Sequence, residues 1–463
     1  MNFSGHSVIV VLFIIAFSIA LSSCSGHKKY TEMQITNDLS KNHDLDNNDN
    51  FSPDDQWLVY DTRTPEGGIG GCRTIEKVNV HTGDIVQVYA TKNATPYGPG
   101  VGAASYSHVE NRIIFIHGLQ NCNAERPYAQ WRRTGVIIDE NNPGKPIFMD
   151  ARDVTPPFTP GALRGGTHRH EWSGDGKWVG FTYNDAIMKA LEDKTGQRWN
   201  LRTIGVSHAL KPVQVDHDAQ GENIDGAWFS VLVVKVVPHP RPGSDEISHA
   251  ADDSWVGLQG YRRPDGTFQR ARAFLGTVTA ENGQPVKEVY IVDIPDRIDI
   301  PGSDGPLQGT LTTFPMPPKG TTQRRLTFTA RTEYPGCSGI VRTSPDGDRI
   351  AFLAKDKNGI DQVFFISPLG SEPRQVTQHE SSVQSGVRWS PDGNWICYIW
   401  DGSLVKCDVR EGDMFGRYER LTPKNDEAPF NPVWSHDGKM IAYNKWVVDE
   451  NGEKTMQIFA VKL

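Results

Sequence analysis

Hydrophobic residues in this chain come in short runs, and a recurring turn phrase separates the runs. The phrase is a bulky residue, then Ser-Pro-Asp-Gly or a near copy, then β-branched and aromatic residues, as in Ser390-Pro391-Asp392-Gly393 before NWICYIW. Proline, aspartate and glycine favour a tight turn, and the flanking residues favour strands. Each copy therefore predicts a β-hairpin. The serines of the copies are Ser52, Ser107, Ser173, Ser344, Ser390 and Ser435.

The spacing of the copies predicts the fold. Ser344 to Ser390 is 46 residues and Ser390 to Ser435 is 45, about the length of a four-stranded propeller blade. A Leu-Thr or Val-Thr phrase precedes each late copy and predicts the outer strand of a blade. The same phrase at Gln34-Ile35-Thr36 predicts that residues 31–37 complete the last blade. We expect an all-β, seven-bladed β-propeller over residues 31–463, closed by this N-terminal strand, with an insertion at about 238–270.

The longest loops are predicted to lie on one face. The Ser-Pro-Asp-Gly turns join the first and second strands of each blade, so connections between the second and third strands lie on the opposite face. The long segments 62–72, 118–133 and 184–198 fall at such connections. Because loops on a rigid scaffold carry many binding residues, we expect a binding site on this long-loop face.

The N-terminus indicates export. Residues 8–21 are an apolar run of secretory type, and LSSCSG follows it. Small residues before Cys24 resemble a bacterial lipobox, which predicts a lipoprotein signal at 1–24, lipidation of Cys24 and a periplasmic, membrane-anchored protein. A plain signal peptide with an incidental cysteine is the alternative. Residues 25–50 are polar and are expected to form a tether that includes the closing strand.

The net charge bears on the class of partner, and the cysteine positions bear on disulfide bonding. The net charge of −8 argues against a nucleic-acid partner, which needs a basic surface. Cys72 and Cys122 lie in loops of adjacent blades on one face, so a disulfide between them is a candidate in an oxidising compartment. Cys397 and Cys407 belong to one hairpin, where a two-residue turn places Cys407 opposite Ile396; these two are expected to be buried thiols.

One constellation carries candidate chemistry. Arg164 and the run THRHEW enter the inner strand of the third blade, where strand alternation places His168 and His170 on one side and Arg169 and Glu171 on the other. The histidines could share a divalent metal or act on an acidic sugar whose carboxylate Arg164 neutralises. They could equally be structural residues of the channel wall. Arg164, His168, His170 and Glu171 are the ligand-binding candidates, and no other cofactor is indicated.

The repeated W-S-P-D-G phrase and its following Leu-Thr strand resemble the TolB-like, WD-type propeller repeats over most of residues 31–463. Longer stretches, such as FSPDDQWLVYDTR, ERPYAQWRRTGVIIDE and TPPFTPGALRGGTHRHEWS, resemble a bacterial family within that class known only as a domain of unknown function. That resemblance implies the propeller fold and supplies no catalytic residues. THRHEWSGDG is also loosely similar to oligogalacturonate lyases, propellers that use channel histidines and a metal.

Two functions follow as hypotheses. The first is a membrane-tethered periplasmic propeller that binds a glycan, a peptide or an envelope partner on its long-loop face. The second is a carbohydrate-active enzyme, a lyase or glycosidase on a uronic acid-containing oligosaccharide, that uses the channel histidines and a divalent metal. The fold hosts both kinds of protein and does not choose between them.

Overall fold

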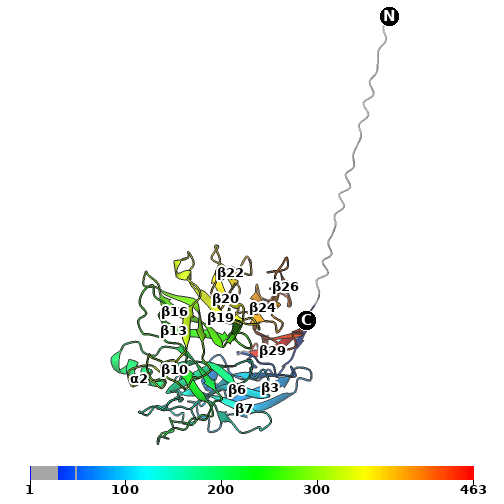
Figure 1. Ribbon diagram of the computed structural model, residues 1–463. Coiled ribbons are helices and arrows are strands. Elements are labelled where there is room, and N and C mark those ends of the chain that lie inside the picture. The colour runs from blue at the N-terminus through cyan, green and yellow to red at the C-terminus, as the bar shows by residue number, and fades with distance from the viewer. Residues whose placement is uncertain (2–29, 47–48) are drawn as a thin grey trace.

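Seven antiparallel sheets are arranged in a ring in the computed structural model, which describes residue 1 and residues 30–46 and 49–463 (Figure 1). The apolar run 8–21 and Cys24 lie outside the described residues. Within the described part of the chain, no helix has the length and hydrophobicity needed to cross a membrane. The seven-bladed all-β propeller predicted from the turn repeats is confirmed.

The strands of each blade run outward from the channel. The first blade contains β2 (Trp57–Asp61), β3 (Thr74–Asn79) and β4 (Ile85–Ala90). The second contains β5 (Val101–Tyr106), β6 (Arg112–Gly118), β7 (Arg133–Asp139) and β8 (Ile147–Phe148). The third contains β9 (Gly165–Trp172), β10 (Trp178–Asp185), β11 (Thr203–His208) and β12 (Phe229–Leu232). The fourth contains β13 (Ile247–Trp255), β16 (Ala271–Thr279), β17 (Pro285–Asp293) and β18 (Thr322–Arg325).

The remaining blades follow the same order. The fifth contains β19 (Cys337–Thr343), β20 (Ile350–Lys355), β21 (Asp361–Ile366) and β22 (Arg374–Gln375). The sixth contains β23 (Arg388–Trp389), β24 (Trp395–Trp400), β25 (Ser403–Asp408) and β26 (Tyr418–Arg420). The seventh contains β27 (Phe430–Trp434), β28 (Met440–Val448), β29 (Lys454–Lys462) and β1 (Glu32–Gln34).

The turn phrase is held together by its serine. In the sixth blade the Ser390 hydroxyl donates to Asp392 at 2.5 Å and accepts from the backbone N–H of Trp395 at 3.0 Å. Gly393, at φ 68°, donates its N–H to the Ser390 carbonyl at 3.0 Å. The serine thus closes both ends of the turn, which explains why the phrase recurs between the first and second strands of the blades that carry it.

The N-terminal strand closes the ring. β1 pairs antiparallel with β29, with Glu32 opposite Val461 and Gln34 opposite Phe459. Just beyond the strand, the N–H of Ile458 donates to the Thr36 hydroxyl at 2.8 Å. The predicted closure is confirmed, and it removes the exposed edge that the seventh sheet would otherwise present.

The predicted tether is shorter than expected. The stretch Asn42–Leu45 is buried, and it bridges to the first blade where Asp44 pairs with Asp61. Leu45 is 1% exposed, and its N–H donates to the side chain of Asn444 at 2.9 Å. Because asparagine side chains replace the missing strand partners, this polar segment forms the inner edge of the first blade instead of a solvated linker.

The connections divide between two faces as predicted. The loops after β2, β6 and β10 lie opposite the turns, and they include α1 (Gly68–Gly71) and α2 (Ala186–Thr195). A short 3-10 helix, η1 (Thr329–Arg331), follows β18. The predicted insertion at 238–270 is largely the fourth blade's own inner strand β13. Its added part is the hairpin β14 (Tyr261–Arg262) and β15 (Phe268–Gln269), on the turn face.

The five described cysteines are free and buried. The predicted disulfide between Cys72 and Cys122 is therefore wrong. The Cys72 thiol lies 3.7 Å from the Thr62 hydroxyl and 3.5 Å from the Thr74 carbonyl, within its own blade. Cys407 does lie opposite Ile396, as the turn length predicted.

Candidate ligand-binding site in the central channel

The histidines of THRHEW do not form a pair on one side of their strand. Opposite Gly180 and Thr182 the register of β9 shifts, and Arg169 at the shift has φ 59°. This bulge interrupts the alternation on which the prediction depended. His170 is fully buried, with Nε2 3.0 Å from the Thr167 hydroxyl, whereas half-buried His168 lies 3.3 Å from the Thr182 hydroxyl.

Both strand histidines are held neutral. Burial, with the nearby charge of Arg133, lowers the pKa of His170 to about 3. Burial, followed by the charges of Arg133 and Arg202, holds the pKa of His168 well below its usual value. Neutral imidazoles enclosed in the wall are structural groups, which was the alternative interpretation of this motif.

Arg164 is a structural anchor and does not reach a ligand site. It is 1% exposed, and its Nε donates to Asp185 at 2.9 Å. Its two terminal nitrogens donate to the carbonyls of Thr310 and Thr313. The predicted convergence of Arg164 with the two histidines at the channel mouth is therefore wrong, because partners from the fold engage all its guanidinium nitrogens.

Glu171 does line the channel. It is 8% exposed and accepts from Arg272, with a contact of 2.9 Å, and from the backbone N–H of Trp255 at 3.2 Å. Arg272 also binds Asp253, with Nε at 2.7 Å, so one buried ion network joins the third and fourth blades. Gly180 makes room for it, since a Cβ there would lie 1.9 Å from Nη1 of Arg272.

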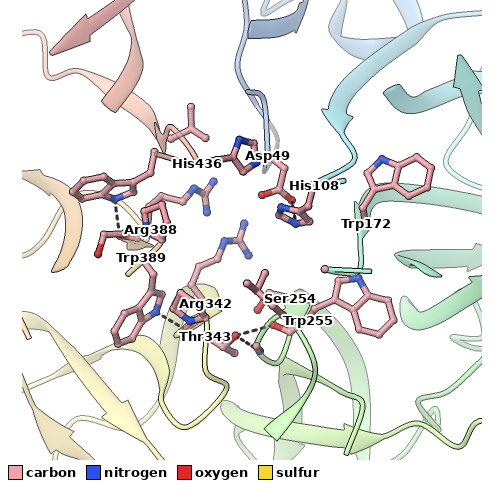
Figure 2. A pocket seen from close by; sticks show the side chains of 18 of the residues that line it. Asp49, His108, Trp172, Ser254, Trp255, Arg342, Thr343, Arg388, Trp389 and His436 are labelled. Atoms are coloured by element: carbon pink, nitrogen blue, oxygen red, sulfur yellow. Dashed lines mark hydrogen bonds and ion pairs between the residues drawn. The ribbon is translucent and has the colours of Figure 1, made fainter. Parts of the chain in front are cut away.

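A cavity of about 400 Å³ opens at the centre of the ring among the Ser-Pro-Asp-Gly turns (Figure 2). It lies on the face opposite the long loops, so the predicted location on the long-loop face is not where this cavity forms. All seven blades contribute to its lining. Its apolar wall includes Phe51, Val109, Trp172, Trp255, Leu258, Pro345, Trp389, Pro391 and Trp434, and its charged or titratable side chains are Asp49, His108, Glu171, Arg342, Arg388 and His436.

Two arginines direct their guanidinium groups toward the middle of the cavity (Figure 2). Arg388 donates from Nε to the Pro432 carbonyl at 3.1 Å, and among the described residues no carboxylate lies within ion-pair distance of it. Burial and the charge of Arg169 lower the pKa of Arg388 to about 10. Arg342 donates to the carbonyls of Val341 at 3.0 Å and Asp253 at 3.3 Å, and burial with the charge of Arg388 holds the pKa of Arg342 well below its usual value.

Two histidines of the cavity lining, His108 and His436, each lie beside a carboxylate. Nε2 of His108 is 3.5 Å from Asp49, and the rings of His108 and His436 are 5.9 Å apart, edge to face. Nδ1 of His436 lies 2.9 Å from Oδ1 of Asp55. The backbone N–H groups of His436 and Asp437 also donate to Asp55, at 2.7 and 2.8 Å. The first, second and seventh blades thus bring two imidazoles together at the rim.

Comparison with known proteins places the chain in a family. Residues 82–223 match the model described as "Protein of unknown function (DUF3748)". A protein of Escherichia coli (strain K12), described as "Uncharacterized protein YidR", is 38% identical over 413 residues, which is 87% of this chain and 92% of that protein. The chain belongs to this family. The predicted membership in a bacterial family of unknown function is confirmed.

Solved structures similar to this DUF3748 propeller share its fold. An oligogalacturonate lyase in complex with manganese aligns with a TM-score of 0.50 and 11% identity, over 94% of this chain and 96% of that one. TolB from Acinetobacter baumannii aligns with a TM-score of 0.34 and 15% identity, over 88% and 80% of the two chains. At 11% identity, the similarity to the lyase shows the propeller fold alone.

The residues of this DUF3748 chain do not fit the predicted metal. No group of three or more His, Cys, Asp or Glu side chains in the described ranges is arranged to hold an ion. Nε2 of His170 already faces the Thr167 hydroxyl. A divalent metal needs a convergent ligand set, and His168 and His170 do not supply one.

Sequence reasoning missed most of the cavity residues, although the repeat held a signal for them. Arg342 and Arg388 immediately precede the bulky motif residue of their blades, the same repeat position as Glu171. His108 and His436 stand where the turn phrase has proline, and Asp55 stands where it has glycine. Since the consensus residues build the turn, residues that depart from it are free to serve a ligand.

Proposed function

We propose that this protein binds an acidic carbohydrate in the cavity on its turn face. The ligand we infer is an oligosaccharide that contains uronic acid, with its carboxylate between Arg342 and Arg388. A cavity of about 400 Å³ suits a small molecule better than a folded partner or a large peptide. This proposal keeps the glycan-binding hypothesis and moves it to the other face.

Arg388 carries the proposal. A guanidinium withdrawn from water is normally paired, because the cost of desolvating its charge is large, and Arg388 is half-buried. Arg388 instead points into the cavity beside Arg342 and near Arg169, with one carbonyl as its described partner. A bound carboxylate would accept two hydrogen bonds from the guanidinium and reduce the repulsion between the arginines.

The cavity wall supports a sugar over a small inorganic anion. Trp389 is half-buried, and its indole N–H donates to the Arg342 carbonyl at 3.2 Å, which fixes the ring beside the arginine. Aromatic and proline side chains suit the apolar faces of a sugar ring. The structural likeness to an oligogalacturonate lyase supports galacturonate oligomers as the first probe.

The test is calorimetric titration of the purified protein with galacturonate oligomers and with neutral galactose oligomers. We expect binding of the acidic series only, and Arg388→Gln should weaken it at least about tenfold through the loss of charge-assisted hydrogen bonds. Arg297→Gln is the matched control, because Arg297 is 66% exposed and pairs with Asp299 outside the cavity. Equal binding of both series, or unchanged affinity in Arg388→Gln, would contradict the proposal.

We further propose that the cavity faces the membrane to which the chain is anchored. β1 enters the ring at the turn face, because Glu32 lies opposite Val461 near the end of β29. Tyr30 lies six positions after Cys24, a reach of about 20 Å for an extended chain. Palmitate labelling of the wild type and of Cys24→Ala tests the anchor, and persistent labelling of the variant would exclude Cys24 as its site.

A further inference from the structure

Asp55 and His436 form an oriented pair that the turn fold does not require. Asp55 has φ 57° at the position where other turns have glycine, and it accepts from Nδ1 and the backbone N–H of His436 and from the N–H of Asp437. These three contacts fix the imidazole ring. His436 lines the cavity, and apart from Asp55 its ring meets the backbone of Ser52.

The second histidine completes an acid–base arrangement. His108 also takes the proline position of its turn, lines the same cavity and lies 3.5 Å from Asp49. The two rings are in edge-to-face contact, with 5.9 Å between their centroids, so adjacent atoms of one substrate in the cavity can approach both imidazoles. Figure 2 shows the guanidinium groups of Arg342 and Arg388 reaching into the same cavity.

We propose that this cavity catalyses β-elimination on the acidic carbohydrate, with His436 as the base and His108 as the acid. The inference rests on the proposed function, since the arginines must hold the carboxylate. An imidazole oriented by a carboxylate through Nδ1 presents Nε2 as a proton acceptor. Arginines around a carboxylate stabilise the negative charge that develops when the neighbouring carbon loses its proton.

The step balances without a co-reactant. Nε2 of His436 takes the proton from the carbon next to the carboxylate, and the electron pair of that C–H bond forms a carbon–carbon double bond. The C–O bond on the next carbon breaks, and the leaving oxygen takes a proton from His108. His436 then releases its proton to water and His108 regains one, so the products are an unsaturated uronate and a shortened sugar.

The local charges support these roles. Burial acts to lower the pKa of His436, but the hydrogen bond and charge of Asp55, with the charge of Asp49, outweigh it, so the pKa lies above its usual value. The charged or titratable groups around His436 are Asp49, Asp55 and His108, and Arg342 and Arg388 line the same cavity. Asp55 does not line the cavity itself, so it is a positioning residue.

The experiment incubates the purified protein with oligomers of galacturonate, glucuronate and mannuronate. Ultraviolet absorbance reports the new double bond, and mass spectrometry separates elimination from hydrolysis, which adds one water. We expect His436→Gln to lower the rate at least about 100-fold while the affinity stays unchanged. His217→Gln is the matched control, since His217 pairs with Asp225 at 3.2 Å and is 65% exposed outside the cavity.

Asp55→Asn separates positioning from folding, because asparagine tolerates the positive φ. The rate should rise with pH as His436 becomes neutral, and this limb should move to lower pH in Asp55→Asn. Binding without product, hydrolytic products, or full activity of His436→Gln would each overturn the catalytic inference and leave the binding proposal standing. Failure of all three oligomers to bind would overturn the proposed function itself.

Discussion

Two pairs of channel histidines show how differently one fold uses the same side chain. His168 and His170 lie in the middle of strand β9, where burial and nearby arginines hold both neutral. His108 and His436 lie in turns at the cavity rim, each within 3.5 Å of a carboxylate. The strand pair stands beside a β-bulge and bonds to threonine hydroxyls of its own blade, whereas the turn pair faces open space.

Residues that stand out in the sequence are not the ones that can reach a ligand. Arg164 and His170 belong to a prominent motif, but contacts within the propeller already engage both side chains. Arg388 directly precedes a copy of the turn phrase and His436 replaces the proline of another copy, and both side chains line the cavity. In a repeat fold, a functional side chain is therefore better identified by the part of it that contacts within the fold do not engage. The number of other candidate residues near it in the sequence is a weaker guide.

The largest expected effect concerns the strand region. Arg164→Ala should destabilise the protein by about 3–5 kcal/mol, because it leaves Asp185 buried without its partner and frees the carbonyls of Thr310 and Thr313. The measurement is denaturant unfolding, with the exposed Arg297→Ala as a control that should change stability little. If stability were unchanged and ligand affinity were lost, Arg164 would be a binding residue and not a structural anchor.

The fold could be predicted because local chemistry determines it. The serine-centred turn needs its residues in fixed order, so each copy marks one hairpin, and the copies set the blades in sequence. The closing strand was also predictable, since β1 carries the same phrase as other outer strands. The packed segment Asn42–Leu45 was not, because its burial depends on Asn444, about 400 positions away.

The site was predictable only in part. Glu171 was found because it lies beside a conspicuous motif, but the side-chain direction of His168 and His170 depended on a bulge at Arg169 that alternation cannot reveal. Asp55 and His436 are separated by 381 residues and meet only because the ring closes. Comparing the repeat column by column would have identified both as departures from the turn consensus.

A smaller effect is expected at His170. His170→Ala removes a fully buried ring that lies beside Phe181 and leaves the Thr167 hydroxyl without this partner, so we expect a loss of about 1–3 kcal/mol. Affinity for galacturonate oligomers should remain unchanged in the folded variant. Titration at a temperature well below unfolding measures this, and a loss of affinity there would contradict the division between the two histidine pairs.

The smallest expected effect is that the contributions of His170 and His436 to stability change with pH in opposite directions. The folded-state pKa of His170, about 3, lies below the unfolded value near 6.5, so the unfolded chain binds the proton first and stability falls as pH drops from about 6.5 toward 3. The pKa of His436 is raised, so its contribution to stability is present below about pH 6.5 and is lost as pH rises through the folded value.

Relative to the wild type, His170→Gln should therefore lose less stability between pH 7 and pH 5. The stability that His436→Gln loses relative to the wild type should be larger at pH 6 than at pH 9, by no more than about 1 kcal/mol, because the Asp55 pair is partly hydrated. Thermal unfolding of both variants across this range is the measurement, and the same sign for both would show that the two histidine pairs share one environment.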